Sequence, residues 1–308
     1  MIRDKNRVLV TGCSGFTGKY VINALKASGY KVYGLASGNI CPQIEPPCYF
    51  SVDMLNRLEI KELILKIQPN YVIHLAAKAF VAHENLVDFY AVNVLGTRYL
   101  LEALCGVKSQ LKHIIIASSA NIYGNTREGL FSELDSPNPV NDYAISKLAM
   151  EYVVKIFLSK LPITISRPFN YTGVGQDEHF IIPKIIKHFK AKANKIELGN
   201  IEVYREFNDV RDIASLYVKL LQARAGGIVN LCSGKYYSLR QILEICENLT
   251  DHWLKVKINI DYVRENELRI LAGDASNLNQ TLDYRPQYEI KDTLRWMLAD
   301  KISSSKVL

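Results

Sequence analysis

The chain of 308 residues is 48% hydrophobic and has a formal net charge of +7, as is typical of a folded globular protein with one large domain or two smaller ones. This charge is mild for the length, and no basic run is interleaved with aromatic residues, so we expect no nucleic-acid binding. The six cysteines show no metal-binding spacing, which predicts free thiols and no metal site. With no signal peptide and no apolar run long enough to cross a bilayer, the sequence predicts a cytoplasmic protein without a membrane partner.

Strands and helices alternate through the first half of the sequence. Predicted strands occupy residues 7–12, 31–36, 48–54, 71–77, 112–119 and 163–170. Predicted helices occupy residues 16–29, 56–68, 84–104 and the segment after Asn141. Short β-rich runs separated by helices of this length indicate βαβ units, and right-handed crossovers then give a Rossmann-type, doubly wound parallel sheet.

The regular alternation of strands and helices ends after about residue 170. Helices are predicted at 180–192, 238–250 and 292–302, a mixture of strand and loop at 196–210, and one more strand within 226–234. We therefore predict a dinucleotide-binding domain over residues 1–168, to which a strand near 227–233 returns. A smaller, interleaved C-terminal substrate lobe is predicted over residues 169–308.

Three glycines follow the first predicted strand and open the first helix. Gly12 permits a tight turn, Gly15 lets the backbone approach a pyrophosphate at the helix N-terminus, and Gly18 allows close packing of helix on strand. Because strand, spacing and helix all agree, this loop predicts a dinucleotide cofactor.

The end of the second strand indicates which dinucleotide is bound. Residues 34–39, "GLASGN", contain no acid that would bind a ribose 2′-hydroxyl and repel a 2′-phosphate. Ser37 could donate a hydrogen bond to such a phosphate, although the segment contains no arginine that would bind it. NADP(H) is therefore favoured over NAD(H).

Tyr143 and Lys147 are four residues apart at the start of a predicted helix, so their side chains share a face. A nearby cation favours phenolate, which predicts a lowered tyrosine pKa and a role in proton transfer. An ordinary exposed helix face would show the same spacing, so the spacing of this pair does not by itself establish a catalytic role.

Other motifs of the sequence give this pair a role through their resemblance to a known family. The glycine spacing, "HLAAKA" (74–79), "IASSANIYG" (116–124), "YAISK" (143–147) and "RPFN" (167–170) occur in the order found in extended short-chain dehydrogenases/reductases that act on nucleotide sugars. The chain resembles this family over nearly its whole length. The resemblance implies that Tyr143 exchanges a proton with the sugar oxygen while Lys147 lowers its pKa and holds the nicotinamide ribose. It also implies that Ser119 bonds the reacting oxygen, with Ser118 as the neighbour that could be confused with it.

The same resemblance implies the cofactor contacts. Asp53 would meet the adenine amino group, and Asn93 would lie near the nicotinamide side, although a buried structural asparagine is the alternative there. The complete predicted set is Gly12, Ser14, Gly15, Phe16, Thr17, Gly18, Ser37, Asp53, Met54, Leu75, Ala76, Ala77, Lys78, Asn93, Ser118, Tyr143, Lys147, Pro168 and Phe169.

A few side chains separate the reactions within the family. The 4,6-dehydratases place carboxylates just after the catalytic Ser or Thr, where this chain has Ala120 and Asn121, so dehydration is disfavoured. The 3,5-epimerase-reductases use a Cys and a His, but no Cys lies near Ser119, and His179 falls one place from the expected position, which Phe180 occupies. A 4-keto reductase and a 4-epimerase with tightly bound NAD remain, with a non-enzymatic NADP-binding module as a third possibility.

The C-terminal segments 167–176, 197–214, 229–234 and 263–274 resemble the family members that reduce GDP-linked 4-keto-6-deoxy sugars, of mannose or heptose type, for surface polysaccharide and lipopolysaccharide synthesis. The "RPFN" segment would lie where nicotinamide and substrate diphosphate meet. A homodimer through helices near 84–104 and 142–160 is also implied. The predicted substrate-binding residues are Ser119, Asn121, Asn170, Phe180, Lys184, Arg205, Arg264 and Glu267.

Overall fold

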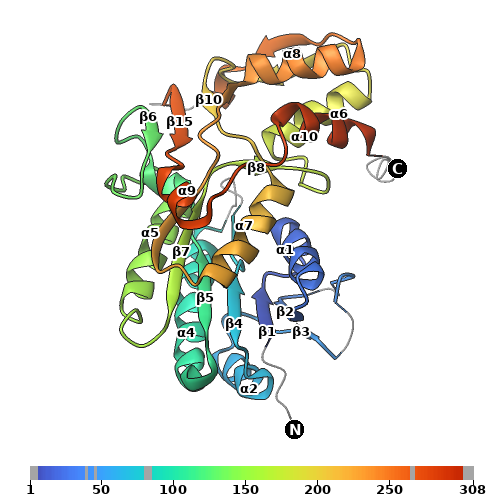
Figure 1. The fold of residues 1–308 in the computed structure, drawn as a ribbon. Coiled ribbons are helices and arrows are strands. Elements are labelled where there is room, and N and C mark those ends of the chain that lie inside the picture. Colours follow the sequence, from blue (N-terminus) through green and yellow to red (C-terminus); the bar gives the residue numbers. More distant parts are fainter. Residues whose placement is uncertain (1–5, 39–40, 45–46, 80–84, 264–267, 301–308) are drawn as a thin grey trace.

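A computed structural model describes residues 6–38, 41–44, 47–79, 85–263 and 268–300 (Figure 1). A seven-stranded parallel sheet forms its centre, in the order β3-β2-β1-β4-β5-β7-β12. The order reverses between β1 and β4, which is where doubly wound sheets bind ligands. The predicted Rossmann-type fold is confirmed. Its strands are β1 (Arg7–Thr11), β2 (Lys31–Ala36), β3 (Tyr49–Ser51), β4 (Tyr71–His74), β5 (His113–Ala117), β7 (Ile163–Pro168) and β12 (Gly227–Leu231).

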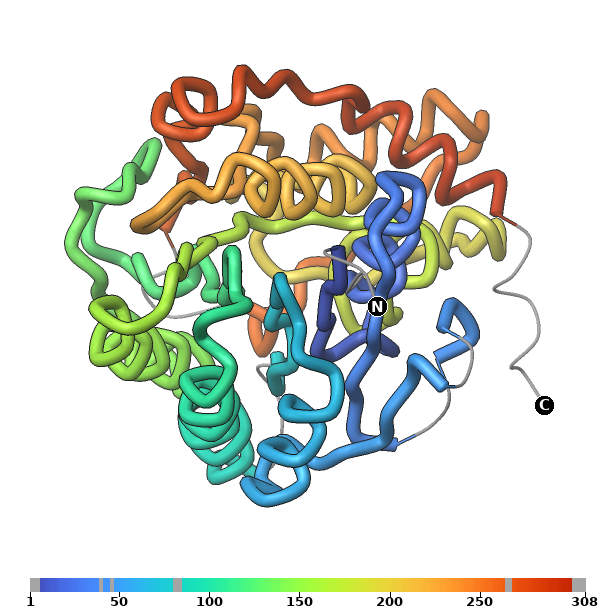
Figure 2. The backbone as a smooth tube through the Cα atoms, turned by 60° about the horizontal axis from the view of Figure 1, so that its bottom comes forward, coloured from blue at the N-terminus to red at the C-terminus, as the bar shows by residue number. Residues whose placement is uncertain are grey.

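Helices cover both faces of the sheet (Figures 1 and 2). One face packs against α1 (Phe16–Ala27), α7 (Val210–Ala223) and α9 (Ser276–Leu282). The other packs against α2 (Arg57–Ile67), α4 (Thr97–Cys105) and α5 (Asp142–Lys155). Because βαβ units bury both faces of a parallel sheet, the strands are mostly apolar, and their few polar side chains, such as His74 and His113, are buried as well.

Two of these helices, α7 and α9, were not among the predicted elements. The sequence of α7, "VRDIASLYVKLLQA", follows directly on the short strand β11 (Asn208–Asp209), and α9 has only seven residues. Both lie beyond residue 168, as does β12, so the sheet layer draws on the second half of the chain.

The helix predicted over 84–104 is not uniform. It consists of α3 (Leu86–Tyr90), a π-helical turn η1 (Ala91–Gly96) and then α4. Such turns are rare and frequently occur at functional sites. Here the turn contains Asn93, one of the predicted cofactor residues.

The remaining segments form a smaller lobe beyond the carboxyl ends of the strands (Figure 1). Helix α6 has an apolar stripe at helical spacing, and it packs with α8, α10, β9 and β14 around a core of its own. The sheet β13-β10-β15-β6 joins four segments that are far apart in the sequence. The helices are α6 (Ile181–Lys190), α8 (Leu239–Thr250) and α10 (Ile290–Ala299). The strands are β6 (Gly129–Phe131), β8 (Tyr171–Thr172), β9 (Lys195–Leu198), β10 (Tyr204–Arg205), β11 (Asn208–Asp209), β13 (Tyr237–Ser238), β14 (Lys255–Ile258) and β15 (Ile270–Gly273).

Short helical turns complete the described chain, namely η2 (Lys108–Gln110), η3 (Ala120–Tyr123) and η4 (Ile260–Tyr262). Within the described residues, none of the helices combines the length and the apolar character that crossing a membrane requires.

Candidate active site

The glycine loop lies between β1 and α1, beside the point where the strand order reverses. Gly12 has a φ of +68°, and a Cβ there would lie 2.7 Å from the amide nitrogen of Ala76, so only glycine fits. A Cβ on Gly18 would lie 2.8 Å from the Cα of Cys13. Gly15 immediately precedes α1, whose first amides have no side-chain cap. These residues fit a pyrophosphate, which would accept hydrogen bonds from those amides.

The first turn of α1 also reaches the segment after β7. The Phe16 ring stacks on Tyr171 with centroids 6.1 Å apart, and Thr17 Oγ1 lies 2.7 Å from the Tyr171 hydroxyl oxygen. Ser14 is half-buried in the loop itself. The predicted cofactor loop is therefore joined to the segment that contains "RPFN".

Residues at the ends of β2 and β3 lie where the adenosine part of a dinucleotide is expected. Ser37 is exposed, and the carbonyl of the next residue, Gly38, accepts a 2.6 Å hydrogen bond from the Tyr49 hydroxyl. Asp53 is exposed as well, whereas Met54 is buried. Because β2 and β3 are neighbours, Ser37 and Asp53 lie at the same edge of the sheet.

The residues Ser119, Tyr143 and Lys147 lie together at the carboxyl end of β5, with 8%, 9% and 3% of their surface exposed. The hydroxyl groups of Ser119 and Tyr143 share a hydrogen bond. Lys147 Nζ donates a 2.6 Å hydrogen bond to the carbonyl oxygen of Ala117, the last residue of β5. The side chain of Asn141 caps α5, so the first turn of this helix starts at a fixed place.

The pKa of Tyr143 contradicts the expectation from its spacing to Lys147. Burial raises this pKa to about 12, a hydrogen bond with Ser119 opposes the rise, and Lys147 is not among the groups that lower it. Burial also lowers the pKa of Lys147 to about 8, against the charge of Glu151. Desolvation therefore outweighs the lysine charge. A phenol with a raised pKa stays protonated at neutral pH and can donate its proton.

Ser118 and Ser119 have different surroundings. The Ser118 hydroxyl is buried and has no hydrogen-bond partner among the described residues. Ser119 Oγ bonds Tyr143 and also accepts from the backbone amide of Asn121, at 3.2 Å. A buried hydroxyl without a partner is the kind of group that a bound ligand satisfies. This contrast fits the prediction of Ser118 as a cofactor contact and Ser119 as the catalytic hydroxyl.

Asn93 is completely buried, and its side chain is fully engaged within the protein. Its Oδ1 accepts from the amide of Lys78 at 2.9 Å, and its Nδ2 donates to the Lys78 carbonyl at 3.1 Å and to Ser146 Oγ at 2.9 Å. Both amide hydrogens are thereby used. Asn93 thus holds the loop of residues 75–78, which contains four of the predicted cofactor contacts.

The predicted substrate side lies in the smaller lobe. Lys184 Nζ donates to the carbonyl of Glu197 at 2.8 Å, and Arg205 donates to the carbonyl of Leu268 at 2.9 Å. Phe180, at the start of α6, is exposed. Both cations of this group therefore hold carbonyl oxygens that an anionic ligand could replace.

The other predicted site residues differ in how far they are exposed. Asn170 is exposed after β7, while Pro168 is half-buried and Phe169 is buried. The predicted pair Arg264 and Glu267 lies outside the described residues.

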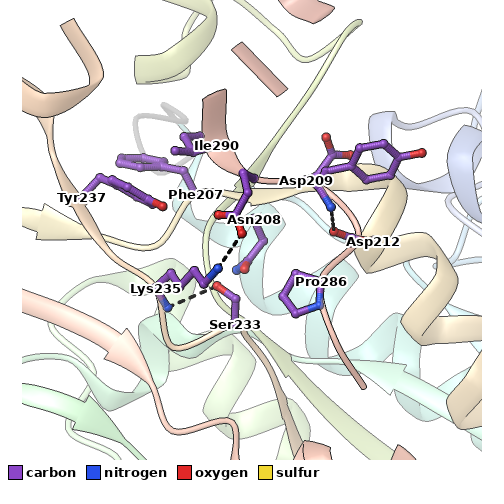
Figure 3. Close-up of a pocket in the computed structure, with 11 residues that line it drawn as sticks. Phe207, Asn208, Asp209, Asp212, Ser233, Lys235, Tyr237, Pro286 and Ile290 are labelled. Atoms are coloured by element: carbon purple, nitrogen blue, oxygen red, sulfur yellow. Dashed lines mark hydrogen bonds and ion pairs between the residues drawn. The ribbon is translucent and has the colours of Figure 1, made fainter. Parts of the chain in front are cut away.

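A shallow hollow lies beside the start of α7 (Figure 3), and neither the glycine loop nor Tyr143 lines it. Its polar groups bind one another: Asp212 accepts from the amide of Tyr288 at 3.1 Å, and Lys235 pairs with Glu289 at 2.6 Å. The carboxylate of Asp209 binds Arg211. The Asp212 contact joins α7 to the C-terminal segment, so we assign the hollow a structural role.

Sequence reasoning gave no role to His74, Thr97 or Ser146. The structure connects all three to Asn93 or its π turn. The four-residue spacing of Asn93 and Thr97 was a visible signal, but the contact with His74 depends on packing between β4 and α4.

Comparisons with known proteins agree with this geometry. The sequence profile of the family described as "GDP-mannose 4,6 dehydratase" matches residues 9–297. A GDP-6-deoxy-D-talose 4-dehydrogenase from Aggregatibacter actinomycetemcomitans is 34% identical over 91% of this chain and 92% of its own. A GDP-6-deoxy-D-mannose reductase from Pseudomonas aeruginosa is 31% identical over 96% of each chain.

Solved structures are similar as well. One, from Burkholderia cenocepacia and provisionally described as an epimerase, is 40% identical and superposes with a TM-score of 0.89 over 95% of this chain and 97% of its own. Another, named RMD, from Pseudomonas aeruginosa and solved with NADPH, is 29% identical with a TM-score of 0.82 over 95% and 98%. The chain therefore belongs to the GDP-mannose 4,6-dehydratase family of nucleotide-sugar short-chain dehydrogenases/reductases.

Proposed function

We propose that the protein uses NADPH, in preference to NADH, to reduce the 4-keto group of a GDP-linked 4-keto-6-deoxy sugar. The observation that carries the proposal is the hydrogen-bonded pair of Ser119 and a protonated Tyr143, one helical turn before Lys147 in α5. A ketone reduction needs one proton donor and one further hydrogen-bond donor at the carbonyl oxygen, and this pair supplies both.

When bound, the reduced nicotinamide supplies a hydride to carbon 4. Tyr143 gives its phenolic proton to the oxygen that becomes the hydroxyl group. Ser119 donates a hydrogen bond to the same oxygen and stabilises the charge that develops there. The charge of Lys147, one helical turn along α5, would stabilise the phenolate that Tyr143 leaves behind, and a proton from solvent then restores the phenol. The three glycines and the loop of residues 75–78 would hold the cofactor.

The turn after Ser119 supports reduction over dehydration. It forms η3, in which Ala120 is buried and Asn121 is half-buried, so neither of these positions carries a carboxylate. An amide cannot accept and return protons at carbons 5 and 6 of the sugar, as a dehydratase must. The chain can therefore belong to this family without performing the reaction that gives the family its name.

The two relatives described above support a GDP-linked substrate, since both names specify GDP and a 6-deoxy-hexose. Talose and mannose differ only in the configuration of carbon 4, so the product is expected to be one of these two 6-deoxy sugars or the corresponding heptose. Arg205, Lys184 and Phe180 would bind the diphosphate and base, together with Arg264 and Glu267.

A 4-epimerase with tightly bound NAD is the second candidate. The provisional description of the similar structure from Burkholderia cenocepacia favours it, as does the epimerase-like stretch "SANIYG". Such an enzyme oxidises and then reduces the same carbon, so it shows no net consumption of cofactor. A non-enzymatic role is not supported by the retained Tyr143 and Lys147.

We also propose a homodimer in the cytoplasm. Exposed apolar side chains gather on the neighbouring helical segments α3, η1 and α5, where a second copy would cover them. They are Leu86, Val87, Leu95, Ile145 and Tyr152, together with Ile156 directly after α5. The six cysteines are unpaired, which suits a reducing compartment. Sedimentation that shows a monomer at micromolar concentration would remove the dimer from the proposal.

The decisive experiment follows the absorbance of NADPH, with NADH in parallel, during incubation with GDP-4-keto-6-deoxy-mannose made in place by a dehydratase. Rapid oxidation of NADPH is the expected result. If neither cofactor is oxidised and the purified protein carries NAD, the epimerase is the better assignment.

A further inference from the structure

His74, at the end of β4, lies within a continuous chain of buried hydrogen bonds. Its Nδ1 lies 2.6 Å from Thr11 Oγ1, and its Nε2 lies 2.8 Å from Thr97 Oγ1. Thr11 Oγ1 accepts from the amide of Ala76 at 3.2 Å, and Thr97 Oγ1 donates to the carbonyl of Asn93 at 2.7 Å. The chain therefore runs from the loop after β4, through the histidine, to the π turn.

The positions of the hydrogens in this chain follow from valence. A carbonyl oxygen can only accept, so the single hydroxyl hydrogen of Thr97 goes to Asn93. Thr97 Oγ1 must then accept from His74, which places the ring hydrogen on Nε2. Nδ1 is left as an acceptor, and Thr11 donates its hydroxyl hydrogen to it. Burial, reinforced by the charge of Lys147, lowers the pKa of His74 to about 3, in agreement with a neutral ring.

The π turn connects this chain of hydrogen bonds to both sides of the candidate site. As described above, the Asn93 side chain holds the amide and the carbonyl of Lys78 and donates to Ser146 Oγ. Ser146 Oγ in turn donates to the carbonyl of Tyr143 at 2.7 Å. One side chain thus fixes the predicted cofactor loop and the first turn of α5.

We propose that His74 is a positioning residue which, through Thr97 and Asn93, keeps the cofactor loop and the Tyr143 backbone in one fixed relation. A bifunctional imidazole suits this place, because it accepts from one threonine and donates to another across the space between β4 and α4. Its effect on turnover rests on the proposed function, whereas its effect on cofactor binding does not. Displacement of a reacting group by about 1 Å can cost about 100-fold in rate.

The fold contains a matched pair for comparison. His113 Nε2, on β5, lies 2.8 Å from Thr164 Oγ1 on β7, and Thr164 donates to the carbonyl of Ala225. Both residues are buried, and burial lowers the pKa of His113 to about 4. This pair has the same chemistry but no hydrogen bond to the π turn or to α5 among those described above.

The test compares Thr97→Val with Thr164→Val, since each removes one buried hydroxyl that bonds a histidine. Both variants should lose a similar amount of thermal stability. Only Thr97→Val should lower kcat, by about 100-fold, and raise the dissociation constant of NADPH measured by fluorescence titration. Thr97→Ser, which keeps the hydroxyl, should restore both values. Equal kcat and equal NADPH affinity in the two valine variants would overturn the proposal.

The NADPH titration separates this proposal from the proposed function. If the wild-type protein binds NADPH but reduces no 4-keto sugar, the function fails while the difference in affinity between the two valine variants still decides the role of His74. If Thr97→Val does not fold, nitrogen-15 NMR of histidine in the wild-type protein provides the test. A neutral His74 with its hydrogen on Nε2 from neutral to mildly acid pH supports the chain, and a hydrogen on Nδ1 contradicts it.

Discussion

The two sides of the candidate site are built in different ways. On the catalytic side, Ser119, Tyr143 and Lys147 are buried, and each makes a hydrogen bond within the sheet layer. On the substrate side, Phe180 is 40% exposed, and Arg205 donates to backbone carbonyls of the smaller lobe. The catalytic groups are thus preorganised by the fold, while the substrate groups must exchange internal partners for the ligand.

This contrast predicts that changes on the catalytic side lower kcat and that changes on the substrate side raise KM. The largest effect is expected for Tyr143→Phe. It removes the proton donor but keeps the ring that packs against Phe89. We expect kcat to fall by about 10²- to 10⁴-fold with unchanged NADPH affinity and melting temperature. Steady-state kinetics that show a kcat within a few-fold of wild type would remove Tyr143 from the mechanism.

Ser119→Ala sharpens the assignment on the catalytic side, with Ser118→Ala as its neighbouring control. Loss of the donor at the developing charge should lower kcat by about 10²-fold. Ser118→Ala should instead weaken NADPH binding, because its buried hydroxyl has no partner within the described protein. The reverse pattern, measured by the same kinetics and titrations, would exchange the two roles.

Arg205→Ala tests the substrate side. Loss of a charge-assisted hydrogen bond to a diphosphate costs about 1.5–3 kcal/mol, which corresponds to a rise in KM of about 10- to 100-fold with kcat little changed. Arg205→Lys should recover only part of this loss, since an ammonium group lacks the planar fork of arginine. A fall in kcat at unchanged KM would contradict the division of the site into two sides.

The pH dependence of kcat tests the charge on Lys147. Its pKa of about 8 means that the charge is lost as the pH rises above that value, so kcat should decline there. Between about 8 and the ordinary lysine value the unfolded chain binds the extra proton, so the contribution of Lys147 to the free energy of unfolding rises with pH. A decline in kcat without a decline in melting temperature is therefore expected. A flat kcat across this range would contradict it.

The smallest effect concerns cofactor choice. Ser37→Asp should raise KM for NADPH severalfold and leave KM for NADH nearly unchanged, because a carboxylate repels the 2′-phosphate. Ser109→Asp, in the exposed turn η2 at the opposite, amino end of the sheet, is the matched control for added charge. Equal effects of the two substitutions on both cofactors would show that Ser37 does not lie at the 2′-position.

Local patterns made the sheet and the glycine loop predictable. The spacing of Gly12, Gly15 and Gly18 reflects a backbone conformation that depends only on residues close in the sequence. The sequence alone therefore identified the loop. The raised pKa of Tyr143 was not predictable, because it depends on burial by segments distant in the sequence. The chain through His74 was missed for the same reason, since strand register and the π turn bring its partners together.

The measurement that tests the central claim most directly uses NADPH that carries deuterium at carbon 4 of the nicotinamide, in both stereochemical forms. With the GDP-4-keto-6-deoxy sugar as substrate, one form should transfer deuterium to carbon 4 of the product, located by NMR, with one NADPH consumed for each product formed. A product without deuterium, or an interconversion that consumes no NADPH, would contradict the reductase and favour the epimerase.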